Sequence, residues 1–156
     1  MALTYHPNIR KLFMGRAVLA AFSSPMAISV YTGSQPTALQ VTNNWTSYTR
    51  VTSLDFLVHY QGGAWTQPNS DILLQLFTIP PGVIPTRSGT ATWAILWNTN
   101  ITGAAVDGAT LPTPNFLVVP VSDSIGQGVI RYADPILFNA TVATILDGSM
   151  GAYLTV

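Results

Sequence analysis

Short runs in which apolar and polar side chains alternate fill the chain from residue 26 onward, and they limit the possible fold more than any other feature. Ile28, Val30 and Thr32 alternate with small or polar residues, and a second run over 53–60 ends at Gly62-Gly63. Successive side chains of a strand point to opposite faces, so such runs, bounded by Gly, Pro, Asn or Asp, predict β-strands.

The same pattern continues to the carboxyl terminus. We expect further strands over 72–79, 90–97, 116–121, 129–132, 136–138, 142–146 and 152–156, with a loop over 98–115 and a hairpin turn at Asp147-Gly148. The 72–79 run is apolar on both faces and should therefore be central in its sheet. The predicted fold class is all-β: a two-sheet antiparallel β-sandwich, jelly-roll-like, preceded by one short N-terminal α-helix.

The amino-terminal segment has a different periodicity. Apolar residues recur at helical spacing between Pro7 and Pro25, which predicts one amphipathic helix over about 7–22. Two interpretations stay open: the helix closes an open end of the sheet core, or it is an arm laid on a partner. The expected organisation is an N-terminal helix or arm over 1–25 and a single β-sandwich domain over 26–156.

Charge is scarce in this chain. Only 8% of its residues are charged, none is Glu, and the formal net charge is zero, whereas soluble domains usually carry about 25%. Zero net charge favours association, so we expect neighbouring subunits to cover much of the surface. An ordinary β-protein with a Thr/Ser/Asn-rich surface is the alternative. No stretch is apolar enough to cross a membrane, and the six basic residues form no patch for nucleic acid.

The sequence offers little for catalysis. There is no Cys, and His6 and His59 lack the neighbours that a metal site requires. Asp55 and His59 share a strand face about 13 Å apart, too far for a direct pair. A Ser–His–Asp arrangement assembled through space stays open, but no Gly-x-Ser-x-Gly motif supports it. The six aspartates are mostly in turn-like sequence. We therefore expect a protein that is not an enzyme, with no metal and no cofactor.

Aromatic residues are the best candidates for contacts. Trp93 and Trp97 share one strand face, which favours packing in a core or interface. Trp45 and Trp65 lie in loop-like sequence, where a tryptophan can anchor a protein interface or stack on a sugar. The residues predicted to contact a partner are Leu12, Phe13, Arg16, Trp45, Trp65 and Tyr153.

Several short motifs resemble those of a family of small structural proteins of tailed-bacteriophage virions. That family begins with an "LT…LRN" helix and continues with a "YTGSQP"-like strand and turn, a "GTATW"-type strand and a "DG" turn. The matching segments here are Ala2-Leu3-Thr4, Asn8-Ile9-Arg10, Tyr31–Pro36, Ser88–Trp93 and Asp107-Gly108, with a fainter match at Gly126–Ile130. The resemblance spans about residues 1–110.

The resemblance implies a non-enzymatic capsid decoration or cement protein. Its partners would be the major capsid protein or other virion proteins, and it would be a homo-oligomer or present in many copies, without nucleic acid or membrane contacts. Its location would be the virion, assembled in the bacterial host cytoplasm. The alternative is a tail or head–tail accessory protein, including a carbohydrate- or receptor-binding module.

Overall fold

The computed structural model describes residues 16–17, 20–21, 25–68, 72–98, 101, 107, 116–123 and 129–151. Arg16, Ala17, Ala20 and Ala21 are helical, and the rest of the helix expected over 7–22 lies outside the described residues. The strand expected over 152–156 also lies outside them. Within the described ranges, no helix is long and apolar enough to cross a bilayer.

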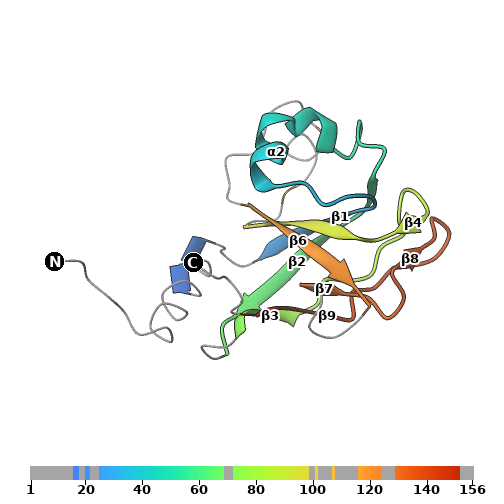
Figure 1. Cartoon of the computed structure of the whole chain (residues 1–156). Coiled ribbons are helices and arrows are strands. Elements are labelled where there is room, and N and C mark those ends of the chain that lie inside the picture. Colours follow the sequence, from blue (N-terminus) through green and yellow to red (C-terminus); the bar gives the residue numbers. More distant parts are fainter. Residues whose placement is uncertain are drawn as a thin grey trace.

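The described part of the chain is mostly β-structure with two short helical turns (Figure 1). The strands are β1 (Met26–Tyr31), β2 (Phe56–Thr66), β3 (Ile72–Thr78), β4 (Gly89–Thr90), β5 (Trp93–Trp97), β6 (Phe116–Ser122), β7 (Ile130–Arg131), β8 (Ile136–Leu137) and β9 (Asp147–Gly151). The helical turns are α2 (Ala38–Asn43) and the 3₁₀ turn η1 (Trp45–Tyr48).

Seven strands form a closed barrel, so the predicted two-sheet jelly-roll sandwich is wrong, although the all-β class is partly consistent. The strand order is β1-β2-β3-β9-β7-β6-β5, and β5 returns to β1. Two pairings complete the closed sheet: β3 pairs with β9, which is distant in the chain, and β6 pairs with the nearby β7 in the only parallel ladder among these strands. Alternation along a strand is the same in a sandwich and in a barrel, so it could not reveal these pairings.

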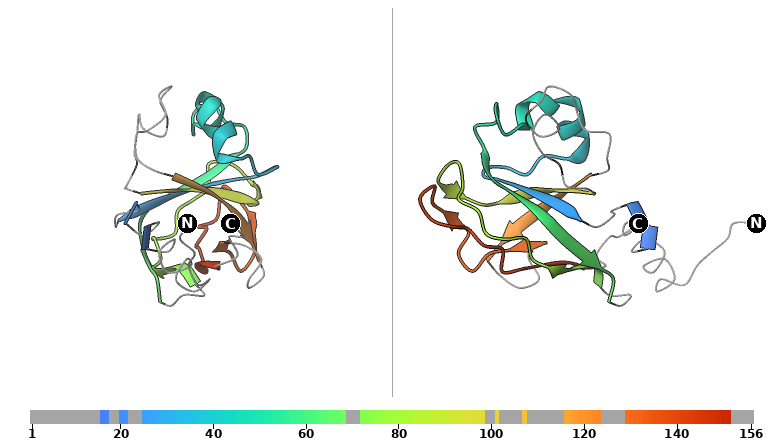
Figure 2. Two further views of the ribbon diagram at one scale, coloured as in Figure 1. Left: turned by 60° about the vertical axis from the view of Figure 1, so that its left-hand side comes forward. Right: turned by 180° about the vertical axis from the view of Figure 1, so that it is seen from behind.

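Strands β1 and β5 are buried on both faces. Met26, Ile28 and Val30 of β1 point into the barrel, while Ala27 and Tyr31 point out into a second apolar cluster. That outer cluster is covered by α2 and η1, which lie over one side of the barrel (Figure 2). Its ring contacts join Tyr31 to Trp93 (4.2 Å, stacked), Trp45 to Trp97 (5.3 Å, edge-on) and Tyr48 to Trp93 (5.8 Å, edge-on). The expected shared face of Trp93, Ile95 and Trp97 is therefore confirmed.

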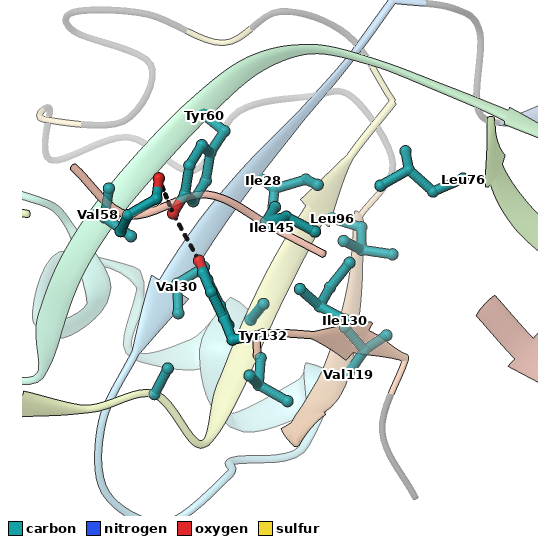
Figure 3. Close-up of a cluster of buried hydrophobic side chains, with 14 of the residues drawn as sticks. Ile28, Val30, Val58, Tyr60, Leu76, Leu96, Val119, Ile130, Tyr132 and Ile145 are labelled. Atoms are coloured by element: carbon teal, nitrogen blue, oxygen red, sulfur yellow. Dashed lines mark hydrogen bonds between the residues drawn. The ribbon is translucent and has the colours of Figure 1, made fainter. Parts of the chain in front are cut away.

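The barrel interior contains one polar pair. The Tyr132 hydroxyl donates to the Tyr60 hydroxyl at 2.7 Å, and Tyr60 donates to the carbonyl of Ala143 at 3.1 Å (Figure 3). Burial raises the pKa of Tyr60 to about 12 and raises that of Tyr132 further, so both hydroxyls keep their protons. The pair connects β2 to the segments that follow β7 and β8.

Three local predictions are also wrong. Gly62-Gly63 does not end β2, because Gly62 adopts a positive φ of 91° and the strand continues past it to Thr66. Asp147-Gly148 is not a turn but the start of β9. The strand expected over 142–146 is not formed, because this segment has only an isolated bridge at Ala143. The expected central position of 72–79 is confirmed, since β3 lies between β2 and β9, although Phe77 on its outward face is 64% exposed.

Candidate interaction surface

A chain of hydrogen bonds crosses the outer faces of β5, β1 and β2. Ser29 lies opposite His59 in the β1–β2 ladder. Trp97 Nε1 donates to Ser29 Oγ at 3.0 Å, and Ser29 Oγ lies 2.7 Å from His59 Nδ1. His59 Nε2 lies 2.8 Å from the carbonyl oxygen of Ile101, which can only accept. His59 therefore carries its proton on Nε2, and Nδ1 accepts from the serine hydroxyl.

The Ser29–His59 pair fits a structural role better than a nucleophilic one. Ser29 is fully buried, and its hydroxyl is held between two ring nitrogens. The second nitrogen of His59 contacts a backbone carbonyl rather than a carboxylate. Burial lowers the pKa of His59 to about 4, with Arg50 adding to the effect, so the ring is neutral near pH 7.

An ion pair lies beside this network. Arg50 Nε and Nη2 donate to the two carboxylate oxygens of Asp107, each at 2.6 Å. The hydrogen bonds from Arg50 lower the pKa of Asp107 and raise that of Arg50. The charges of this pair are mutually compensated, which leaves little net field at the site.

A hollow of about 330 Å³ opens next to the ion pair, and we call it the Ile84 hollow. Its apolar side includes Val51, Val83 and Ile84, and its polar side includes Arg50, His59 and Asp107. Both ring nitrogens of His59 already have partners in the protein. Among the described residues, no group of His, Asp or Glu could hold a metal ion.

A two-stranded ribbon continues from the Ile84 hollow. Its pairs are Val83 with Ala143, Gly89 with Leu137, and Thr90 with Ile136. All three pairs have the same register, so 83–90 and 136–143 form one antiparallel ribbon that is irregular in the middle. Leu137 and Ala143 are buried in the barrel core, which fixes the inward face of the ribbon.

The outward face of the ribbon is apolar and exposed. In an antiparallel ladder, Ile84 lies opposite Val142 once Val83 pairs with Ala143, and opposite residues point to the same side. We define the ribbon face as four side chains with their exposed fractions: Ile84 (57%), Ile136 (52%), Phe138 (55%) and Val142 (58%). Several adjacent exposed apolar side chains of this size are typical of an interaction site.

A second hollow lies on the other edge of the ribbon. It has a volume of about 340 Å³ and is lined by segments 132–134, 136–138 and 141–144, and we call it the Phe138 hollow. Ile84 borders the first hollow and Val142 borders the second. Apolar side chains of the ribbon face therefore border both hollows, which have similar volumes.

Among the residues that were predicted from the sequence to contact a partner, the described ones do not lie on the ribbon face. Trp45 and Trp65 are only 4% and 5% exposed, because Trp45 packs in the outer cluster and Trp65 in the barrel core. Arg16 is exposed, whereas Leu12, Phe13 and Tyr153 lie outside the described residues. The structure brings none of the described ones to the ribbon face.

The ribbon face was not predicted from the sequence. Ile136-Leu137-Phe138 is apolar on both sides of its strand, as a doubly buried strand would also be. Only the exposure of Ile136 and Phe138 in the structure distinguishes a strand with one exposed apolar face from a strand that is buried on both faces. The sequence feature that could have indicated an exposed apolar face was this short apolar run with turn residues on each side, in a chain with few charges.

No protein-family model, curated protein or solved structure matches this chain.

Proposed function

We propose that this protein is a non-enzymatic structural subunit of a bacteriophage particle, most simply a capsid decoration or cement protein. The ribbon face is the observation that carries the proposal. It is apolar and exposed on a chain with a net charge of zero. The resemblance of segments such as Tyr31–Pro36 and Ser88–Trp93 to phage virion proteins supplies the biological setting.

The energetics of the ribbon face support association. Fully burying a Val, Ile or Phe side chain contributes about 1.5–3 kcal/mol. The four side chains of the ribbon face are each roughly half exposed, so covering them would contribute roughly 3–6 kcal/mol. Few charges would have to lose water in the process, because the four side chains are apolar and only 8% of the residues of the chain are charged.

The carbohydrate-binding alternative loses its main support. It required Trp45 or Trp65 as a platform for stacking on a sugar, and both side chains are buried. A tail or head–tail position uses the same apolar surface as a capsid position, and copy number distinguishes the two.

The test is incorporation of variants into particles. Ile84→Asp places a charge in the ribbon face, and Phe77→Asp places the same charge at an equally exposed apolar position on β3. In virions purified from cells that express each variant in place of the wild type, we expect at least a tenfold drop for Ile84→Asp and little change for Phe77→Asp. Hundreds of wild-type copies per particle would indicate decoration, and a handful would indicate a tail or connector position.

Absence of the wild-type protein from purified particles would refute the proposal. Equal incorporation of the two variants would refute the role of the ribbon face in attachment.

A further inference from the structure

We propose that the ribbon face binds a second copy of this chain, so that two subunits meet through the same surface about a two-fold axis. This inference deepens the proposed function by naming the neighbour that covers the ribbon face. It is carried by two features of the described surface: the relief of the ribbon face and the placement of charge at its edges.

The shape of the ribbon face and its surroundings is suited to packing against a second copy of the same surface. A symmetric two-fold interface requires one patch that carries both protruding and receding parts. Here the exposed Ile84 side chain borders the Ile84 hollow and the exposed Val142 side chain borders the Phe138 hollow, and the two hollows have volumes of about 330 and 340 Å³. Two copies turned against each other can therefore place apolar side chains of one subunit toward a hollow of the other.

The charges at the two edges are of opposite sign. Arg87 is exposed on the edge beside the 49–55 turn, where its Nη1 donates to the carbonyl of Ser53 at 3.0 Å. Asp134 lines the Phe138 hollow on the opposite edge, where Oδ1 accepts from the backbone nitrogen of Ile136 at 2.9 Å. Neither has an ion-pair partner within the described residues.

A second copy supplies the missing partners. A two-fold axis that brings the Arg87 edge of one subunit to the Asp134 edge of the other creates two identical opposite-charge contacts. The patch is then complementary to itself in charge as well as in relief. The barrel is closed, although β6 joins β7 through only two residue pairs, so side-chain packing on the ribbon is the mode of association that the described surface favours.

The experiment exchanges these charges in the purified full-length protein. Sedimentation equilibrium should show a concentration-dependent dimer of the wild type. Arg87→Asp alone places Asp against Asp at both contacts, and Asp134→Arg alone places Arg against Arg, so each should raise the dimer dissociation constant about tenfold or more. An equimolar mixture of the two single variants should restore binding to within about threefold of wild type, as should the double variant.

A control must show that the recovery of binding with Asp134→Arg does not come only from the change in the net charge of the protein. Leu39→Arg/Gln75→Arg adds the same two positive charges as Asp134→Arg, at exposed positions on α2 and β3. Because this control keeps Arg87 and Asp134 and dimerises with itself, the measurement follows binding of labelled Arg87→Asp to an excess of each partner variant. Labelled Arg87→Asp should bind the control more weakly than it binds Asp134→Arg, because one of the two contacts then sets two carboxylates against each other.

The inference is overturned if the wild type stays monomeric at high concentration, or if the control recovers binding as well as Asp134→Arg does. Its failure is separable from failure of the proposed function. If the protein is monomeric but its incorporation into particles still requires Ile84, only the dimer proposal is refuted. If the protein dimerises but is never found in virions, only the proposed virion function is refuted.

Discussion

At the scale of single residues, the two buried tyrosines of the barrel make unequal contributions. Tyr60 both donates to Ala143 and accepts from Tyr132, whereas Tyr132 only donates. Tyr60→Phe therefore removes both bonds and leaves the buried Tyr132 hydroxyl without its acceptor, while the Ala143 carbonyl still accepts from the backbone N–H of Val83. It should cost about 2–3 kcal/mol of unfolding free energy. Tyr132→Phe leaves the Tyr60–Ala143 bond in place and should cost only about 1 kcal/mol. Urea denaturation of both variants measures the difference, and equal losses would contradict this account of the pair.

His59 gives the protein a defined acid response. The pKa falls from 6.5 to about 4 on folding, chiefly through burial. The unfolded chain therefore takes up the proton first, so the stabilisation is complete above pH 6.5 and is lost as the pH falls from 6.5 toward 4. The total loss should be about 3 kcal/mol.

The control for this response is His59→Gln, whose amide can still donate to Ile101. Its unfolding free energy should change much less between pH 6.5 and 4.5 than that of the wild type. The lowered pKa of Asp107 acts below 3.8 and so lies outside this window. Equal slopes for the two proteins in this range would show that His59 is not the titrating group.

At the scale of elements, the structure that a local sequence pattern adopts depends on the segments that it pairs with. The run 53–60 was expected to end at a glycine pair, yet β2 passes through it, because Gly62 can adopt a positive φ and Gly63 packs against Pro80 and Leu76. Asp147-Gly148 has the composition of a turn, but Asp147 pairs with Arg131 across the β7–β9 ladder. Turn propensity is local, and in both places long-range pairing overrides it.

The ribbon shows that the exposure of an apolar side chain is also not predictable from a local sequence pattern. One strand was expected over 90–97, but the structure divides this run into β4 and β5, whereas the strand expected over 136–138 exists as β8. The pairing of β4 with β8 and the exposed side of Ile136 were not predictable, because an apolar run does not tell whether its second face meets the protein's own core or a partner.

At the scale of the whole molecule, closure of the barrel depends on a close approach at β9. A side chain on Gly148 would place its Cβ 3.1 Å from Trp65 Cη2 and 3.2 Å from Leu76 Cβ. Gly148→Ala should therefore cost about 1–3 kcal/mol through overpacking where β9 meets the core. Ser149→Ala, an exposed change in the same strand, should lie within about 0.5 kcal/mol of wild type. Thermal or urea unfolding measures both, and a Gly148→Ala variant as stable as wild type would contradict the tight closure.

The sequence by itself determined that the chain is rich in β-strands, that Trp93, Ile95 and Trp97 share a face, and that few of its side chains are charged. Each of these follows from residue type and period, which act within a few residues. Only the tertiary structure decided that β3 pairs with β9 and β6 with β7 to close a barrel, that Trp45 and Trp65 are buried, and that Ile84, Ile136, Phe138 and Val142 are exposed together. These properties depend on which segments pair and pack together in the folded chain, and side-chain alternation carries no information about which strands become neighbours.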